Sequence, residues 1–585
     1  MFERLLIANR GEIAVRVIRT AREMGLQTVA VYSEADRDAL HVRMAGEAYL
    51  LGPAAPAQSY LNVEKLIDIA VRSRAQAIHP GYGFLAENAA FARAVIGAGL
   101  LWIGPHPDAI DAMGDKVRAR RAMVAAGVPV VPGGTEPIAD VAGAREAARR
   151  YGLPLALKAS GGGGGKGLKV ARSLEEIESA FDTAHREAEA YFKNGTIYAE
   201  RYLDNPKHVE LQILADKHGT VLHVGERDCS LQRRHQKLWE EAPATVSDRV
   251  RRGVREAGIR AAQSIGYDSA GTVEFLVAGD EFFFLEMNTR IQVEHTVSEM
   301  LSGMDLVREQ IRVAADERLG YDQNAIVLRG HSIEVRVNAE DPARGFSPAP
   351  GTIRAYREPG GLGVRVDSAA YPGFVISPDY DSMIAKLVVW APTRLRAIAR
   401  LRRAIDEYEI AGVPTTLPLL RALCDDPSVI GANYGTATLE AFAAALQPAA
   451  GRDEIPAPAA PSSPGDVLRI EVNDKLYRVR MLDAPVSSRA SQEPRGGPPR
   501  AAPRHLGSRR TTAGDGDDVL SPMHGVVVEM KAVRGEPVAE GQLVAVVEAM
   551  KMMNEIRAHK GGTVKHVYAA SGDTVEAQSP LVTLE

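Results

Sequence analysis

The chain has 585 residues, of which 45% are hydrophobic and 25% are charged, and its formal net charge is −5. This composition is typical of a globular protein long enough for several domains, and the negative charge argues against nucleic acid as its main partner. Two cysteines, Cys229 and Cys424, are too few for a disulfide scaffold or a structural zinc site. The first apolar run breaks at Asn9, too early for a signal or membrane segment, so we expect a cytoplasmic protein that binds no membrane.

The amino-terminal region alternates between strand and helix patterns. Residues 5–8 and 29–32 are apolar runs typical of buried strands, and Ile13, Val17 and Ala21 recur at helical spacing between them. This alternation predicts a parallel sheet. Residues 9–12 occupy the first strand-to-helix turn, but they lack the glycines of a dinucleotide-binding fingerprint.

A glycine-rich run, KASGGGGGKG, covers residues 158–167. Strand patterns at residues 155–158 and 168–171 flank it, so no helix follows and a Rossmann fingerprint is excluded. A Walker loop is excluded as well, because no Lys-Ser or Lys-Thr pair follows the glycines. The run therefore predicts the tip of a β-hairpin whose backbone N–H groups can close over phosphates.

Two glutamates are predicted to face each other across a second hairpin. Residues 272–277 and 282–286 have strand patterns, and pairing about residue 280 places Glu274 opposite Glu286. Directly opposed carboxylates repel each other, and a chain tolerates them when a cation lies between them. Carboxylates and phosphates are the usual environment of Mg²⁺, and Asn288 is close enough to add a ligand.

These features belong to a dense set of motifs that resembles a known family. The motifs are residues 6–12 (LIANRGE), 79–84 (HPGYGF), the glycine-rich run, 226–237 (ERDCSLQRRHQK) and 286–295 (EMNTRIQVEH). Together they resemble the ATP-grasp biotin carboxylase module, from the amino terminus to about residue 445. The resemblance outweighs the alternative that the basic residues 233–237 form a solvated or RNA-facing patch.

The resemblance implies a role for each matching residue. The ATP site would include Lys116, Lys158, Gly163, Gly164, Gly165, Glu200, His208, Gln232, His235 and Leu276, and the ligands of Mg²⁺ or Mn²⁺ would be Glu274, Glu286 and Asn288. Arg290, Gln292 and Val293 would bind bicarbonate with Lys237 beside them, Glu294 would be the general base, and Arg336 would face the biotin ureido group. The residue types suit these roles, because the planar guanidinium of Arg290 matches a bicarbonate face and Glu294 can take its proton.

After residue 446 the composition becomes that of a linker, rich in Pro, Ala, Ser and Arg, as far as residue 516. Residues 467–482 alternate around Asn473-Asp474 and predict a hairpin, and residues 484–516 are expected to be disordered. This segment has two possible roles, which both remain open. It could be a flexible tether that lets the carboxy-terminal region move, or a basic tail that docks on a partner.

The carboxy-terminal residues 517–585 contain an internal repeat. Gly525, Val527, Gly535 and Val538 recur 37 residues later as Gly562, Val564, Gly572 and Val575, which predicts a small all-β unit of two similar halves. Lys551 lies between the halves within EAMKM, and the segment SPMHG precedes it at residues 521–525. These motifs resemble the biotinyl domain of biotin-dependent carboxylases, which implies that Lys551 carries biotin.

The sequence thus predicts an α/β multidomain protein. We expect a Rossmann-like pre-ATP-grasp domain at residues 1–114, an ATP-grasp domain at 115–330, a biotin carboxylase C-terminal domain at 331–446, the linker at 447–516 and a biotinyl (lipoyl-like) barrel at 517–585. The resemblance implies the biotin-containing alpha subunit of an acetyl-CoA or propionyl-CoA carboxylase, acting in a hetero-oligomer with a separate carboxyltransferase subunit and modified by a biotin protein ligase. The alternatives are the equivalent subunit of a pyruvate, methylcrotonyl-CoA or urea carboxylase, or a non-catalytic biotin carrier with a decayed ATP-grasp module.

Overall fold

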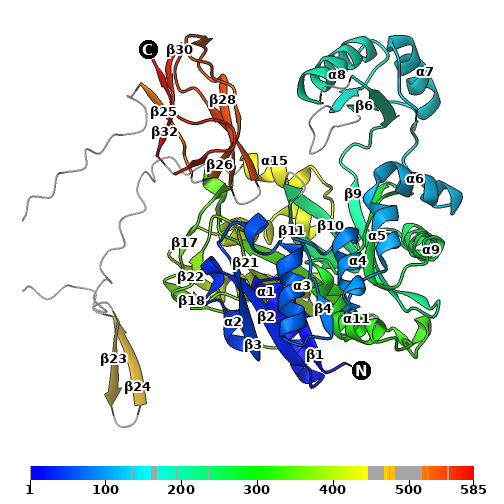
Figure 1. Ribbon diagram of the computed structural model, residues 1–585, viewed down its shortest axis with the longest axis vertical. Helices are drawn as coiled ribbons and strands as arrows, with labels where there is room; N and C mark the ends of the chain where they lie inside the picture. Colours follow the sequence, from blue (N-terminus) through cyan, green and yellow to red (C-terminus); the bar gives the residue numbers. More distant parts are fainter. Residues whose placement is uncertain are drawn as a thin grey trace, which may run out of the picture.

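The computed structural model describes residues 2–134, 136–159, 168–192, 195–233, 236–445, 467–472, 475–480, 517–523, 525–549, 552–576 and 578–585. Figure 1 shows the path of the chain from the amino-terminal domain to the carboxy-terminal β-domain. Within the described part of the chain, none of the helices combines the length and the hydrophobicity needed to span a bilayer.

The amino-terminal domain is the predicted parallel sheet, in the order β3-β2-β1-β4-β5. Its strands are β1 (Arg4–Ile7), β2 (Gln27–Ser33), β3 (Glu47–Gly52), β4 (Ala77–His79) and β5 (Leu101–Trp102). Because side chains alternate along β1, Leu5 and Ile7 pack under α1 (Gly11–Glu23), while Leu6 faces α3 (Val63–Arg72) and α4 (Ala89–Gly97). The sheet is therefore covered by helices on both faces, as a buried parallel sheet requires.

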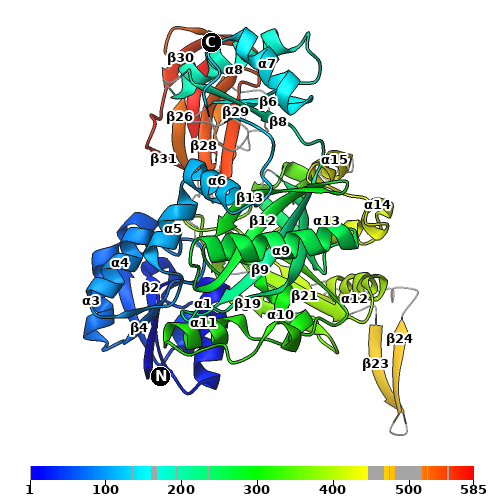
Figure 2. The same cartoon turned by 90° about the vertical axis from the view of Figure 1, so that its right-hand side faces the viewer.

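A small lobe carries the predicted glycine-rich hairpin. Strands β6 (Leu155–Ala159), β7 (Leu168–Ala171) and β8 (Ile197–Arg201) form an antiparallel sheet in which Lys158 lies opposite Leu168. Helices α7 (Val141–Tyr151) and α8 (Ile177–Phe192) pack on it around a core of their own. The flanking strands confirm the predicted hairpin, and the lobe stands apart from the body of the protein (Figure 2).

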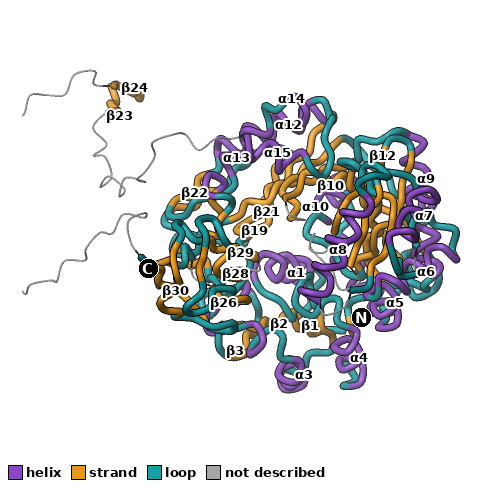
Figure 3. Tube along the Cα trace, turned by 90° about the horizontal axis from the view of Figure 1, so that it is seen from above, coloured by secondary structure: helices purple, strands orange, loops and turns teal. Residues whose placement is uncertain are grey.

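A long antiparallel sheet forms the rest of the body, in the order β13-β12-β9-β10-β11-β14-β21-β19. Its strands are β9 (Lys207–Ala215), β10 (Val221–Arg233), β11 (Gln236–Ala242), β12 (Ser269–Ala278), β13 (Glu281–Asn288), β14 (His331–Asn338), β19 (Val364–Ser368) and β21 (Met383–Ala391). Strand β14 pairs with β11, so the sheet crosses the predicted domain boundary after residue 330 without a break. Seen from above, the strands from β19 to β12 form one continuous band (Figure 3).

Two amphipathic helices cover one face of this sheet with their apolar sides. Helix α9 (Asp248–Ser264) packs on β9 and β12, and α12 (Arg394–Glu407) packs on β14 and β21. Helix α10 (His295–Ser302) crosses the opposite face near β14, and α11 (Leu306–Ala314) joins the core under α1.

The remaining helices are α2 (Leu40–Met44), α5 (Pro107–Gly114), α6 (Lys116–Ala125), α13 (Leu417–Leu423), α14 (Pro427–Ile430) and α15 (Thr438–Ala445). Short strand pairs join β15 (Glu340–Asp341) to β16 (Ser347–Pro348), β17 (Gly351–Thr352) to β20 (Val375–Ile376) and β18 (Ala355–Arg357) to β22 (Glu409–Ala411).

The carboxy-terminal domain consists of two facing sheets, ordered β25-β32-β30-β27 and β29-β28-β26-β31. Their strands are β25 (Asp518–Leu520), β26 (Gly525–Met530), β27 (Pro537–Val538), β28 (Leu543–Ala549), β29 (Met552–Arg557), β30 (Gly562–Val567), β31 (Thr574–Val575) and β32 (Pro580–Leu584). The repeated valines Val527, Val538, Val564 and Val575 all lie in its core. The predicted two-fold repeat is therefore confirmed.

The linker contains the predicted hairpin. Strands β23 (Val467–Val472) and β24 (Lys475–Arg480) pair in antiparallel register around residues 473–474. The other linker residues, including the segment expected to be disordered, lie outside the described residues.

Candidate active site

Charged side chains collect on the face of the long sheet that α9 and α12 leave open. They come from strands whose alternate residues are apolar: in β14, Ile333, Val335 and Val337 enter the core under α12, so Glu334 and Arg336 point the other way. The same alternation in β12 places Glu274 on this face. The described members of this charged face are Glu210, Arg227, Lys237, Glu240, Glu274, Glu334, Arg336 and Lys386.

Lys237 on β11 is surrounded by acidic groups. Its ammonium donates to Glu294 Oε1 at 2.8 Å, to Glu274 Oε1 at 3.2 Å and to Glu210. Burial alone would lower the pKa of Lys237, but the three carboxylates outweigh it and hold this pKa well above its usual range. Lys237 is therefore a permanent cation at the centre of the charged face.

Glu294 is held as a carboxylate between two cations. Burial would raise its pKa, but the charges of Lys237 and Arg336 lower it well below its ordinary value. Arg336 donates from Nη2 to Glu294 Oε2 at 3.0 Å and from Nε to Glu240 Oε1 at 2.7 Å. Burial raises the pKa of Glu240 to about 8. The predicted base and the predicted biotin-facing arginine are thus in direct contact.

The predicted pairing of Glu274 with Glu286 is confirmed, but a β-bulge produces it. Ala278 pairs with Glu281, and continuing that register would place Glu274 opposite Leu285. A register shift beside Glu274 leaves Leu285 as the extra residue, and this shift restores the predicted pair. Sequence symmetry about residue 280 gave the correct partners without revealing the bulge.

Glu274 is buried, and both oxygens of its carboxylate accept hydrogen bonds. Its carboxylate accepts from His208 Nε2 at 2.7 Å, from Asn288 Nδ2 at 2.6 Å and from Gln292 Nε2 at 2.6 Å. Burial would raise the pKa of Glu274, but Lys237 and His208 lower it. The carboxylate is therefore ionised and surrounded by the residues predicted to bind metal, nucleotide and bicarbonate.

The predicted metal ligands have suitable chemistry. Glu274 and Glu286 present carboxylates from paired positions, and Asn288 adds an amide oxygen on the same strand as Glu286. Hard divalent cations prefer such oxygen donors. Among the described residues, ligand atoms of Glu274, His208 and Glu210 also lie within 4.8 Å of one another, but the imidazole nitrogen of His208 is a poorer ligand for Mg²⁺ than an oxygen.

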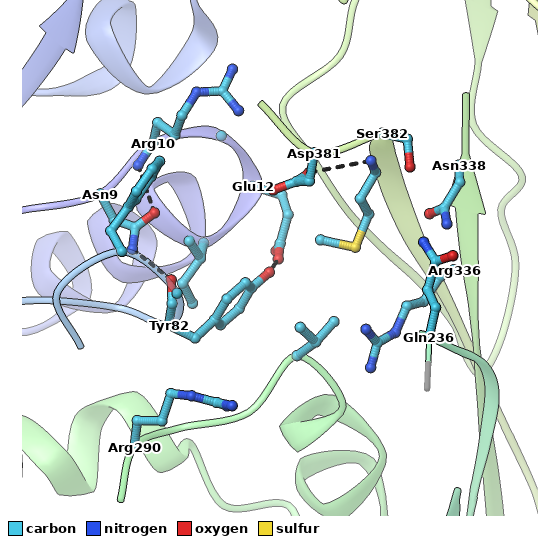
Figure 4. A pocket seen from close by; sticks show the side chains of 16 residues that line it. Asn9, Arg10, Glu12, Tyr82, Gln236, Arg290, Arg336, Asn338, Asp381 and Ser382 are labelled. Atoms are coloured by element: carbon cyan, nitrogen blue, oxygen red, sulfur yellow. Dashed lines mark hydrogen bonds between the residues drawn. The ribbon is translucent and has the colours of Figure 1, made fainter. Parts of the chain in front are cut away.

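A cavity of about 280 Å³ opens beside the charged face (Figure 4). Arg290, Val293 and Arg336 line it together with Tyr82 and Glu12 of the amino-terminal domain. Arg290 is held by Glu87 Oε2, 2.9 Å from its Nε, and by Asn288 Oδ1, 2.8 Å from its Nη2. Three of the residues predicted to bind bicarbonate or biotin therefore share one cavity.

The predicted ATP-binding residues divide between two places. Lys158 bonds Glu200 in the small lobe, whereas Gln232, His208 and Leu276 belong to the long sheet. Leu276 is half-buried against Val131, Leu203 and Phe283. Lys116 begins α6, and its side chain is not described. Gly163, Gly164, Gly165, His235 and Lys551 lie outside the described residues.

Four family descriptions match the chain in succession. They are "Biotin carboxylase, N-terminal domain" at residues 1–110, "Carbamoyl-phosphate synthase L chain, ATP binding domain" at 115–321, "Biotin carboxylase C-terminal domain" at 334–441 and "Biotin-requiring enzyme" at 517–584. The biotin-dependent acyl-coenzyme A carboxylase alpha3 subunit of Mycobacterium leprae is 45% identical to the chain, over 100% of it and 98% of the relative. The chain belongs to the biotin carboxylase family. It carries a fused biotin carrier domain, so it is an ATP-dependent ligase that carboxylates biotin.

Solved biotin carboxylases resemble the first three domains. A biotin carboxylase from Campylobacter jejuni, described as a β-γ-ATP complex, is 46% identical with a TM-score of 0.70 and covers 75% of this chain and 99% of its own. The biotin carboxylase domain of 2-oxoglutarate carboxylase from Hydrogenobacter thermophilus, described as a dimer with MgADP, ADP and bicarbonate, is 50% identical with a TM-score of 0.69. It covers 75% of this chain and 98% of its own. The predicted fold of this biotin carboxylase is thus confirmed.

Sequence reasoning missed several residues of the carboxylase site. Arg227 is fully buried and donates to Glu210 Oε2 at 3.1 Å and to Gln292 Oε1 at 2.6 Å, which orients the amide of Gln292. A signal for Glu210 was present, since His208, Glu210 and Gln212 alternate with apolar residues along β9. Glu12 lies within the motif of residues 6–12, but its role was not predicted. No comparable pattern indicates Glu240 or Lys386, because Arg336 and Val293, which they contact, come from other domains.

Proposed function

We propose that Glu294 is the general base for bicarbonate in this biotin carboxylase, with Arg290 as the anchor for the anion. The observation that carries this proposal is the ionised Glu294 carboxylate between Lys237 and Arg336, beside the cavity that Arg290 lines. Glu294 takes the bicarbonate proton, and the resulting oxyanion attacks the γ-phosphate of ATP to form carboxyphosphate and ADP. The positive charges of Lys237 and Arg290 offset the charge on the reacting oxygens.

Residues on the sheet and in the small lobe would hold the nucleotide. Lys158 and Glu200 from the lobe, and His208, Gln232 and Leu276 from the sheet, are proposed to line the ATP site. The further proposed ATP-site residues are Lys116, Gly163, Gly164, Gly165 and His235. Glu274, Glu286 and Asn288 are proposed to hold Mg²⁺ or Mn²⁺, which would supply positive charge to the phosphates of the bound nucleotide.

The carrier domain would present biotin, which is carboxylated after carboxyphosphate has formed. Lys551 lies between β28 and β29, whose last pair is Ala549 with Met552, and its motif supports it as the site of biotin attachment by a biotin protein ligase. Biotin supplies the ring nitrogen that accepts the carboxyl group. Arg336 would place its guanidinium beside the ureido oxygen and stabilise the negative charge that develops there.

The test is ADP release by the purified chain with free biotin, measured with and without bicarbonate. We expect ATP turnover to require bicarbonate, and we expect Arg290→Lys to raise the KM for bicarbonate because an ammonium cannot form the paired hydrogen bonds of a guanidinium. Bicarbonate-independent turnover at the same rate would overturn the proposal.

We further propose acetyl-CoA or propionyl-CoA as the final acceptor and a separate carboxyltransferase beta subunit as the partner. The relative from M. leprae, matched over 98% of its length, is named an acyl-coenzyme A carboxylase alpha3 subunit, which supports an acyl-CoA acceptor and a further subunit. Labelled bicarbonate should enter malonyl-CoA or methylmalonyl-CoA when the partner subunit is present, and no acyl-CoA product should form with this chain alone. Product formation by the isolated chain would contradict the proposal.

A further inference from the structure

We propose that Lys386 is a positioning residue that holds the loop of residues 290–294 in the conformation that binds bicarbonate. This inference rests on the proposed function, in which that loop anchors the anion. Lys386 lies on β21 of the C-terminal domain, and its side chain is completely buried. Its ammonium donates to the carbonyl oxygen of Val293 at 3.0 Å, so it contacts the loop through the backbone.

The register of the sheet pairs Lys386 with Arg336. The two residues are direct cross-strand neighbours on β21 and β14, and like charges in that relation are unfavourable. Arg336 binds the side chain of Glu294, while Lys386 binds the carbonyl of the preceding residue, Val293. Two adjacent cations on the sheet therefore hold two successive residues of the loop.

Lys386 also connects the loop to the amino-terminal domain. Glu12 Oε2, at the start of α1, lies 3.2 Å from its ammonium, and Glu12 accepts a hydrogen bond from the hydroxyl of Tyr82. Figure 4 shows Tyr82 and Glu12 joined in this way at the wall of the cavity. Asp367 is farther from Lys386, at 3.9 Å, and is neutralised by Arg365, whose Nη2 lies 2.6 Å away. Lys386 therefore connects the parts of the cavity wall that three domains contribute.

The hydrogen bond to Val293 sets the direction of a peptide group. Because a trans peptide is planar, its carbonyl and the next N–H point in opposite directions, so turning the Val293 carbonyl toward Lys386 turns the Glu294 N–H away from it. Loss of the ammonium would free this peptide to rotate. The expected result is weaker bicarbonate binding with little change in ATP binding, because among the described residues the contacts of Lys386 do not include those proposed to bind the nucleotide.

A simpler role for Lys386 is neutralisation of the buried carboxylate of Glu12. Burial raises the pKa of Glu12 to about 7 even beside Lys386, so in the single variant Lys386→Met this buried carboxyl would lose its cationic partner and take up a proton, and a defect in this variant alone would not separate the two roles. The double variant Lys386→Met/Glu12→Gln removes both charges and keeps similar side-chain volumes. If neutralisation were the whole role, the double variant would regain wild-type kinetics.

The experiment measures KM for bicarbonate, KM for ATP and the unfolding temperature of the full-length chain with free biotin as substrate. The double variant should fold, keep its KM for ATP within about twofold, and raise its KM for bicarbonate by roughly ten- to hundredfold, the range expected for one lost hydrogen bond from a charged donor. Lys217→Met is the control for loss of a lysine-to-carbonyl hydrogen bond elsewhere, because the ammonium of the exposed Lys217 also donates to a backbone carbonyl, that of Ala314 at 3.0 Å, away from the loop. This control should leave both KM values unchanged.

Each other outcome decides against the proposal. A folded double variant with a wild-type KM for bicarbonate would overturn it, and a double variant that does not fold would assign Lys386 to stability alone. A wild-type chain without bicarbonate-dependent turnover would instead refute the proposed function, so the two failures are distinguishable.

Discussion

The carrier domain and the carboxylase module differ in how charged and apolar side chains are distributed. In the carrier, the core of the two sheets is apolar, and the proposed biotin site, Lys551, falls in the sequence between β28 and β29, two positions before Met553, which is 49% exposed. In the carboxylase, Glu274 and Glu294 are buried, and both carboxylates contact the ammonium of Lys237, whose side chain is only 12% exposed. The carrier therefore needs a local motif on a stable scaffold, whereas the carboxylase needs charges whose partners come from several domains.

The largest effect that would test this contrast is expected at the carrier. Lys551→Arg keeps the charge but cannot form the biotin amide, so streptavidin binding and carboxylation of the carrier should be lost completely. Carboxylation of free biotin should persist, because the carboxylase site is separate. Lys565→Arg, an exposed carrier lysine, is the control and should keep its biotin. Persistent streptavidin binding by Lys551→Arg would refute the assignment.

The next effect separates two roles within the carboxylase. Glu294→Gln should lower bicarbonate-dependent ADP release by about 10²–10⁴-fold, the usual contribution of a general base, with nucleotide affinity near normal. Glu286→Gln should instead abolish turnover by weakening metal binding, and folding should change little because a repulsion with Glu274 is relieved. Equal loss of ATP affinity in both variants would show that the division into base and metal ligand is wrong.

The stability of the carrier should depend on apolar packing and not on charge. Leu581 is fully buried in its core, so Leu581→Ala should destabilise the carrier by about 2–5 kcal/mol in chemical unfolding. Carboxylation of free biotin should be unaffected. Val567→Ala, at a side chain that is 37% exposed, should change stability by less than about 0.5 kcal/mol. A loss of free-biotin activity in Leu581→Ala would mean that the two regions are energetically coupled.

The stability of the carboxylase, unlike that of the carrier, should depend on charge and should therefore fall in acid. Burial would raise the pKa of Glu241, but hydrogen bonds from His331 and Arg394 lower it to about 2. A carboxyl whose pKa is lower in the folded state stabilises the protein above its unfolded pKa, near 4.5, and this contribution disappears as the pH falls toward 2. The shift corresponds to about 3 kcal/mol at most.

Thermal unfolding of wild type and Glu241→Gln at several pH values would measure this contribution. The difference in midpoint should be largest near pH 7 and should shrink below pH 4.5. Glu409→Gln removes a carboxylate from an exposed pair with Arg357 and should show a small difference at every pH. A constant difference for Glu241→Gln would argue against an ionised Glu241 in the fold.

The sequence by itself determined the features that depend on neighbours along the chain. The β-α-β start, the hairpin around the glycine-rich run and the carrier repeat were all predictable, because strand period, helix period and glycine turns are local properties. The motifs of residues 226–237 and 286–295 also identified Lys237, Glu294 and Arg290, although the resemblance and not the spacing supplied their roles.

The tertiary structure alone decided how these pieces share one site. It paired β11 with β14 across the predicted domain boundary, which brought Arg336 to Glu294, and it introduced the bulge at Leu285 that aligns Glu274 with Glu286. It also buried Lys386 against Val293 and Glu12, residues 93 and more than 370 positions away in the chain. A buried charge is tolerated when its partner is present, and here the partners come from other domains, so no pattern along one strand could reveal them.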